Sequence, residues 1–221
     1  MSRNRRSISD LIKRAWKWNN PAGWFEAVYA GAAAGEGIVP WALMQPHPDL
    51  VAWLTENGID GTGKTAIVVG AGLGDDAEAL SERGFDVSAF DISETAIAQC
   101  KRRYPNSRVQ YRVADVLNFP DQWRGGFDLV LEIHTIQALP HQFTETVIVN
   151  IAALAAKGGV VLVMCFAREP EADNRGIPWP LSRDDLAAFG RQGLIEMSFK
   201  DHQLDGIRRF CVAYQKIESS T

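Results

Sequence analysis

The chain alternates between short apolar runs and longer stretches in which apolar residues recur at helical spacing. The run Ile67-Val68-Val69 is short and β-branched, which is typical of a buried strand. Similar runs predict further strands at 85–91, 108–113, 127–131 and 160–166. Helical spacing predicts helices over 75–83, 93–103 and 142–156. Strands separated by helices in this rhythm predict an α/β fold, a parallel sheet with helices on both faces.

The amino end departs from this rhythm. We expect a short amphipathic helix within 2–18, with a capping box at Ser7 and with Trp16 and Trp18 on its buried side. A second helix is expected over 22–32.

An irregular, glycine-rich segment over 31–46 follows, with Trp41 at its centre. His47 then opens a helix that ends at Gly58. The segment's aromatic rings either plug the core or form a lid whose ring faces line a ligand pocket, and Trp41 is the best candidate for the second role.

The carboxyl end also has its own pattern. Residues 168–179 are polar and contain prolines, so we expect a loop on the substrate side. A helix is expected over 182–192, opened by a capping box at Ser182. Two strands, 194–202 and 208–215, are expected to form a hairpin that turns at Asp205-Gly206.

The strand Ile67–Val69 stops at glycines on alternate positions, Gly70, Gly72 and Gly74, and an acidic helix begins at once. A Cβ in such a turn blocks close approach of a ligand or forces strained dihedral angles. Strand, glycine turn and helix together are typical of a nucleotide-like cofactor site at the carboxyl edge of a parallel sheet. The alternative is a glycine-rich turn without a ligand.

The second predicted strand ends in a carboxylate, Asp91, roughly 20 residues beyond Gly70. An acid at this place in nucleotide-binding α/β domains accepts hydrogen bonds from the ribose hydroxyls. The alternative is that Asp91 only caps the helix that begins near Ser93.

The acidic helix start bears on the choice of cofactor. Asp75 stands where the dinucleotide fingerprint has its third glycine, and Asp76 follows it. A pyrophosphate at this helix start would meet both carboxylates, which is repulsive. S-adenosylmethionine carries no phosphate, so the pattern favours this methyl donor over NAD.

These motifs resemble motif I and its neighbours in class I S-adenosylmethionine-dependent methyltransferases, and more narrowly those of the thiopurine, halide and thiol methyltransferase family. Val68 stands where most class I enzymes have an acid, and this family also has an apolar residue there. Ala42 stands where the family usually has Asp. The matching segments are Gly70-x-Gly72-x-Gly74-x-Asp76, Phe90-Asp91-Ile92-Ser93, Ala138-Leu139-Pro140 and Pro40-Trp41.

The resemblance implies a Rossmann-like, seven-stranded and mostly parallel sheet that ends in an antiparallel strand. It implies S-adenosyl-L-methionine as the cofactor, with the exocyclic amine of adenine on Asp115 and the ring beside Val116. The implied cofactor-binding residues are Gly70, Gly72, Gly74, Asp76, Asp91, Ile92, Asp115, Val116, Glu132 and Trp41.

The tip of the fourth strand should face the transferred methyl group. His134 is the candidate general base for a hydroxyl acceptor, whereas a thiol needs little help and a halide needs none. The alternative is that His134 only packs or forms hydrogen bonds. Glu132 is a second candidate, either for orienting the acceptor or for holding the methionine ammonium. Weaker pocket candidates are His141, Arg168 and Glu169.

Composition agrees with an ordinary globular enzyme. The chain has 221 residues, 46% of them hydrophobic, and a net charge of −4 without a dense basic cluster beyond the amino end, so we expect no nucleic-acid partner. The three cysteines are scattered and lack metal spacing, which fits a reducing cytoplasm and no metal site. No apolar stretch is long enough for a membrane span. We expect one structural unit: a helical arm and lid over 1–60 and a cofactor-binding core over 61–221.

The sequence therefore predicts a cytoplasmic S-adenosylmethionine-dependent methyltransferase that acts on a small-molecule acceptor, a thiol, halide or thiopurine-like nucleophile. The alternative within the class is a small-molecule O- or N-methyltransferase that uses His134 as its base. An NAD(P)-dependent reductase is disfavoured because the third glycine and a Tyr-x-x-x-Lys pair are missing. A non-catalytic sensor of an adenosyl ligand is a further alternative. The sequence leaves the oligomeric state open.

Overall fold

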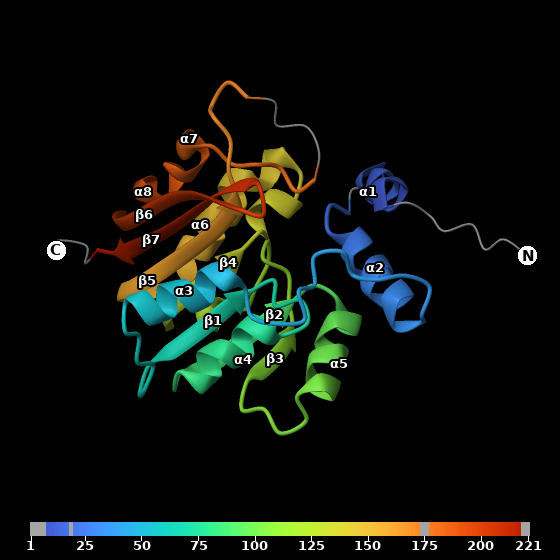
Figure 1. Cartoon of the computed structure of the whole chain (residues 1–221), viewed down its shortest axis with the longest axis horizontal. Helices are drawn as coiled ribbons and strands as arrows, with labels where there is room; N and C mark the ends of the chain where they lie inside the picture. Colours follow the sequence, from blue (N-terminus) through green and yellow to red (C-terminus); the bar gives the residue numbers. More distant parts are fainter. Residues whose placement is uncertain (1–7, 18–19, 173–176, 218–221) are drawn as a thin grey trace, which may run out of the picture.

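The computed structural model of the protein describes residues 8–17, 20–172 and 177–217. Within these residues, seven strands form one sheet in the order β3-β2-β1-β4-β5-β7-β6 (Figure 1). The strands are β1 Thr65–Val69, β2 Asp86–Asp91, β3 Gln110–Val113, β4 Phe127–Ile133, β5 Ala155–Phe166, β6 Leu194–Leu204 and β7 Ile207–Lys216.

Strands β3, β2, β1, β4 and β5 are parallel, and β7 lies antiparallel between β5 and β6. The predicted sheet, with its antiparallel last strand, is confirmed. The chain order reverses at β1, which pairs with β2 on one side and β4 on the other. Ligands of open α/β sheets bind at such a reversal, outside the carboxyl ends of the strands.

Helices cover both faces of the sheet, as predicted. Leu50, Leu80 and Ile97 of α3, α4 and α5 pack in one buried cluster against one face. Ile148 of α6 and Phe189 of α8 pack in another cluster against the opposite face. The α-helices are α1 Ile8–Lys17, α2 Gly23–Ala33, α3 Pro48–Glu56, α4 Asp75–Glu82, α5 Glu94–Arg103, α6 Thr144–Leu154, α7 Arg183–Leu186 and α8 Ala188–Arg191, and the short 3₁₀ turns are η1 Asp121–Trp123, η2 Ile136–Ala138 and η3 His141–Phe143.

Two boundaries differ from the sequence prediction. Helix α6 ends at Leu154 rather than at 156, and β5 begins at Ala155 rather than at 160, so that Gly158 and Gly159 lie inside the strand. Ala155 already pairs with Phe127, and the register of the β4–β5 ladder shifts before the next pair, Leu129 with Val160. The two glycines lie in the extra residues of β5 at this shift. The predicted helix over 182–192 is divided into α7 and α8, although the Ser182 capping box is present.

The amino-terminal helices α1 and α2 stand beside the sheet rather than on it (Figure 1). The carboxylate of Glu26 on α2 accepts hydrogen bonds from the Ser93 hydroxyl and from the Thr95 N–H and hydroxyl, at the start of α5. This contact holds the arm against the core. Ser7 and Trp18 lie outside the described residues, as does the side chain of Trp16.

None of the helices among the described residues is both long and apolar enough to cross a bilayer.

Candidate active site

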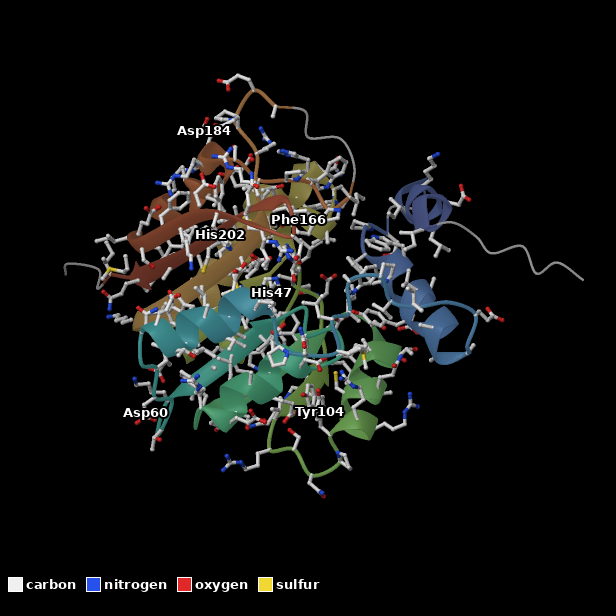
Figure 2. The ribbon with its side chains drawn as sticks, viewed as in Figure 1. His47, Asp60, Tyr104, Phe166, Asp184 and His202 are labelled. Atoms are coloured by element: carbon white, nitrogen blue, oxygen red, sulfur yellow. The ribbon has the colours of Figure 1, made fainter. Side chains whose placement is uncertain are left out.

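A cavity of about 450 Å³ opens at the carboxyl ends of β1, β2 and β4. The loops after these strands form its floor, and α2 with the segment 40–47 forms its cover. Figure 2 shows His47 and Phe166, which both line it, between the edge of the sheet and the arm. The predicted site residues that line the cavity are Gly70, Gly72, Asp76, Asp91, Ile92, Asp115, Val116, His134 and Trp41.

The three alternate glycines all have left-handed backbone angles, with φ of 70°, 56° and 92° at Gly70, Gly72 and Gly74. Two of them line the cavity, whereas Gly74 lies behind it as the residue before α4. A Cβ on Gly74 would stand 2.6 Å from the Tyr111 hydroxyl. Gly74 therefore allows close packing of helix on strand and does not line the cofactor site.

Asp91 lies at the end of β2 with both carboxylate oxygens engaged. One accepts the N–H of Gly72 and the other the N–H of Ser93, each at 2.9 Å. Burial raises the pKa of this carboxyl to about 6. Each oxygen keeps a second lone pair, so the residue that braces the turn can also accept ribose hydroxyls. Capping and ligand binding are thus compatible at Asp91.

Asp115 and Val116 line the cavity beyond Asp91 and Ile92. The Asp115 carboxylate accepts the N–H of Leu117 at 2.8 Å, which fixes the turn after β3. Val116 is buried in the large core cluster. The order of these residues matches that expected for ribose followed by adenine.

The acidic start of α4 is less repulsive than the sequence suggests. Asp75 forms two hydrogen bonds with the guanidinium of Arg103, at 2.7 and 2.8 Å. Asp76 accepts the N–H of His47 at 2.7 Å, and burial raises the pKa of its carboxyl to about 6. The argument against a phosphate ligand from these two charges is therefore weaker in the folded chain.

Trp41 closes the cavity from the segment between α2 and α3. Its ring meets those of Trp24, Phe25 and Tyr29 edge-on, at centroid distances of 5.6, 6.1 and 5.8 Å. Its indole N–H donates to the Tyr29 hydroxyl at 2.9 Å. Trp41 remains 39% exposed, so it belongs to the rim as well as to the cavity wall.

His134 follows β4 in a left-handed conformation, with φ of 61°. Its Nδ1 lies 3.0 Å from Oε1 of Gln137, and this oxygen also accepts the N–H of Phe166. Because Oε1 only accepts, Nδ1 carries the proton and Nε2 is left as an acceptor. Burial lowers the pKa of the imidazole to about 4, which keeps it neutral.

Glu132 does not line the cavity. Its Oε1 accepts the N–H groups of Thr135 and Ile136, at 2.6 and 3.0 Å, beneath the turn that carries His134. Burial raises the pKa of the carboxyl to about 7. Glu132 therefore supports the turn from outside the cavity, whereas the sequence predicted that it would face the cofactor or acceptor.

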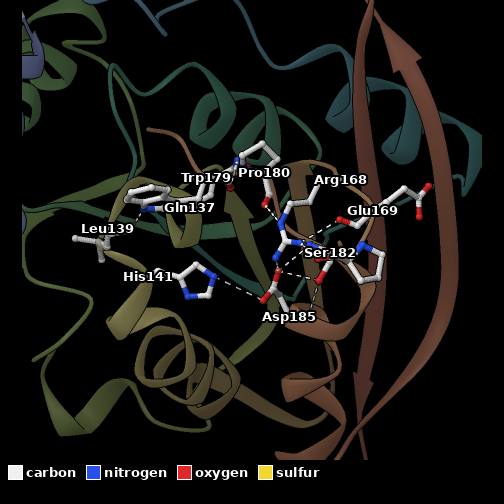
Figure 3. A network of polar contacts seen from close by, with 10 residues as sticks. Gln137, Leu139, His141, Arg168, Glu169, Trp179, Pro180, Ser182 and Asp185 are labelled. Carbon is white, nitrogen blue, oxygen red and sulfur yellow. Dashed lines mark hydrogen bonds and ion pairs between the residues drawn. The ribbon is translucent and has the colours of Figure 1, made fainter. Parts of the chain in front are cut away.

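The three weaker candidates lie outside the cavity, in the polar network of Figure 3. The Arg168 guanidinium donates to Asp185 and to three backbone carbonyls, and His141 approaches Asp185 at 3.9 Å. Glu169 forms an ion pair with Arg208. This network holds the segment after β5 in place.

Several residues of the cavity wall had no predicted role in binding. His47 was interpreted only as a helix start; it does cap α3 through its side chain, but its ring also lines the cavity 5.6 Å from that of His134. Tyr29, Phe166, Ile177 and Pro178 also line it. The helical spacing around Tyr29 predicts the helix but gives no signal that its ring reaches the cavity.

The fold and the site define a Rossmann-like α/β protein whose cavity lies at the chain reversal, where ligands of open α/β sheets bind. A methyltransferase-domain family model matches residues 66–159. A probable thiol methyltransferase of Arabidopsis thaliana is 33% identical over 105 residues, covering 46% of this chain and 43% of the relative. A ubiquinone biosynthesis O-methyltransferase of Dechloromonas aromatica is 28% identical over 128 residues, covering 57% and 54%.

The chain spans about half the length of the curated relatives that it matches. The solved N-methyltransferase NodS of Bradyrhizobium japonicum, in complex with S-adenosyl-L-homocysteine, has a TM-score of 0.71 and 18% identity, covering 90% of this chain and 100% of that one. The family match and the sheet order show that residues 66–159 resemble the cofactor-binding domain of class I S-adenosylmethionine-dependent methyltransferases.

S-adenosylmethionine, the cofactor of such methyltransferases, fits the residues present. Gly72 opens to the cavity, and a Cβ there would stand 3.3 Å from the Tyr29 hydroxyl. Carboxylates suited to a diol and an amine, Asp91 and Asp115, line the same cavity beside apolar Ile92 and Val116.

Proposed function

We propose that this protein transfers the methyl group of S-adenosylmethionine to a small-molecule acceptor that carries a thiol. The observation that carries this proposal is the protonation of His134. Its Nδ1–H is committed to Gln137, and its Nε2 has no partner among the described residues of the cavity wall. The chain thus offers one hydrogen-bond acceptor to the proton of an incoming nucleophile.

The pKa of His134 favours a thiol over the other acceptors. An imidazole with a pKa of about 4 is a weak base near neutral pH and does little to ionise a hydroxyl. A thiol has an ordinary pKa of about 8.5 and is partly ionised without help. A halide has no proton for Nε2 to accept. The thiol methyltransferase relative supports the same choice.

In this reaction the residues of the cavity would bind the methyl donor, orient the acceptor and exclude water. Bound S-adenosylmethionine supplies the activated methyl group. Asp91 accepts the ribose hydroxyls and Asp115 the adenine amine, so the donor is held at the strand ends. His134 Nε2 would accept a hydrogen bond from the bound thiol and orient its sulfur, and it would take the thiol proton as the new S–CH₃ bond forms and the C–S bond to the methyl donor breaks. Trp41 and Tyr29 cover the cavity and exclude water. Holding both reactants in line lowers the barrier, because the entropy of bringing them together is lost on binding rather than in the reaction.

A hydroxyl acceptor is the second candidate. It is favoured by the relatives in ubiquinone biosynthesis and by the place of His134 on the cavity wall, where Nε2 can accept a hydrogen bond from a hydroxyl. The two candidates differ in their need for His134. A thiol should still be methylated by a His134→Ala variant, whereas a hydroxyl should not.

The test offers labelled methyl donor to the wild type with aryl thiols, bisulfide, iodide and catechols. We expect transfer to thiols, retained within about tenfold in His134→Ala because a thiol needs little base catalysis. The matched control is His141→Ala, a histidine outside the cavity. Transfer to catechols alone, lost in His134→Ala, would establish the O-methyltransferase. Tight binding of S-adenosylhomocysteine without transfer to any acceptor would indicate a sensor.

A further inference from the structure

The Tyr29 hydroxyl lies next to the glycine turn, on the side of the cavity that α2 and the segment 40–47 cover. Tyr29 is 2% exposed and comes from α2, far in sequence from the turn. A Cβ on Gly72 would lie 3.3 Å from its oxygen, which is closer than ordinary contact. The hydroxyl is thus placed where it would touch any ligand that fills the turn.

This hydroxyl has an unused donor. Its oxygen accepts the indole N–H of Trp41, and its own hydrogen finds no acceptor among the described residues. Burial and the nearby Asp91 raise the pKa of the phenol, so the proton stays in place. A buried donor without an acceptor costs free energy unless a ligand or water satisfies it.

The groups of the cofactor differ in what they offer such a donor. The ribose hydroxyls would donate to Asp91, and their oxygens, like the adenine ring nitrogens, are neutral acceptors. The sulfonium and the ammonium are cations and cannot accept a hydrogen bond. The carboxylate of the methionine part is the one anionic acceptor, and a hydrogen bond to a charged group is stronger than one between neutral groups.

We propose that Tyr29 donates a hydrogen bond to the carboxylate of the methionine part of the cofactor, and that Trp41 positions it. The inference rests on the proposed function, because it requires an adenosyl methionine-type ligand. The chain Trp41 N–H, Tyr29 O–H and carboxylate would polarise along its length, each hydrogen bond strengthening the next. Binding of the cofactor would thereby hold Trp41, and with it the segment 40–47, over the acceptor.

The test compares two ligands by calorimetry: S-adenosylhomocysteine, and 5′-methylthioadenosine, which lacks the amino-acid part. Tyr29→Phe should lower the affinity for S-adenosylhomocysteine by about 10- to 100-fold and leave the affinity for 5′-methylthioadenosine unchanged. Trp41→Phe keeps a ring but removes the indole N–H that donates to Tyr29. It should therefore also lower only the affinity for S-adenosylhomocysteine, by a smaller factor than Tyr29→Phe. Tyr214→Phe is the matched control, since Tyr214 is also buried but stacks on Phe189 outside the cavity.

The outcomes separate the two proposals. If Tyr29→Phe binds both ligands as the wild type does, or loses both equally, the carboxylate assignment is overturned while the methyltransferase stands. If the wild type binds neither ligand, the proposed function itself fails. A thermal-shift scan of each variant without ligand, compared with that of Tyr214→Phe, reports whether the fold is intact.

Discussion

The Nδ1 atom of His134 and the Oε1 atom of Gln137 lie 3.0 Å apart, and this contact decides which nitrogen of the imidazole is an acceptor. The amide orientation is set independently, because Oε1 accepts the N–H of Phe166 and Nε2 donates to the carbonyl of Trp179. The tautomer of His134 therefore depends on the segment after β5 as much as on its own turn.

Replacement of Gln137 by Glu should raise the pKa of His134 well above 4. A carboxylate beside Nδ1–H stabilises the imidazolium, and an opposite charge at this range shifts a pKa by about 1 to 3 units. NMR titration of the labelled histidines would measure the change. Gln137→Met, which has no charge, should leave the imidazole neutral over the same pH range, and an unmoved resonance in the Glu variant would contradict the assigned tautomer.

Asp91→Ala should weaken the binding of S-adenosylhomocysteine by about 1.5 to 3 kcal/mol for each hydrogen bond that the ribose loses to a charged group. The N–H groups of Gly72 and Ser93 also lose their acceptor, so stability should fall too. Calorimetry and thermal melts separate the two effects. Asp86→Ala, at the exposed opposite end of β2, is the control. Unchanged affinity in Asp91→Ala would refute the ribose assignment.

Gly74→Ala should destabilise the fold more than Gly63→Ala. Both glycines have left-handed angles, with φ of 92° and 74°, so both variants carry a similar backbone strain. A Cβ at Gly63 meets nothing within 4 Å, whereas one at Gly74 meets the Tyr111 hydroxyl at 2.6 Å. Tyr111 is itself bonded to Glu78 and cannot move away freely. We expect an extra loss of about 1 to 3 kcal/mol in the free energy of unfolding, measured by urea denaturation.

The sequence was sufficient where a local signal determines the structure. Asp205-Gly206 is a turn pair, and β6 and β7 pair across it. Ser182 forms its capping box with Asp185 as the spacing predicts. The alternation of apolar runs and helical stretches likewise predicted the parallel sheet. In each case the residues that decide the geometry are close together in the chain.

The sequence was insufficient where the outcome depends on distant parts of the chain. Glu132 ends up beneath the cavity because the chain reverses at His134, a residue that gives no glycine-like signal for its φ of 61°. The glycines at 158 and 159 resemble a turn, yet pairing of Ala155 with Phe127 draws them into β5. Tyr29 on α2 and His47 at the start of α3 reach the cavity only because these segments, distant in sequence from the strands, lie against the strand ends.

The affinity for S-adenosylhomocysteine should fall as the pH drops below about 6. Burial raises the pKa of Asp91 to about 6 from its ordinary 3.8, and an ionised carboxylate is the form that accepts both ribose hydroxyls. Each pH unit below 6 should then cost about tenfold in affinity, because binding releases a proton.

The stability of the ligand-free protein should respond to this carboxyl with the opposite sign. A carboxyl whose folded pKa is raised contributes stability that is present below pH 3.8 and is lost as the pH rises through 6. His134 acts the other way, because its pKa falls from 6.5 to about 4 and stability is lost as the pH drops through that window. Calorimetric affinity, rather than a melting temperature, therefore isolates the ligand effect. The variant Asp91→Asn should bind S-adenosylhomocysteine more weakly at pH 7, and its affinity should depend little on pH. If its affinity changes with pH as steeply as that of the wild type, the proton belongs to another group. Asp76 is the first to test, because its pKa is also raised to about 6.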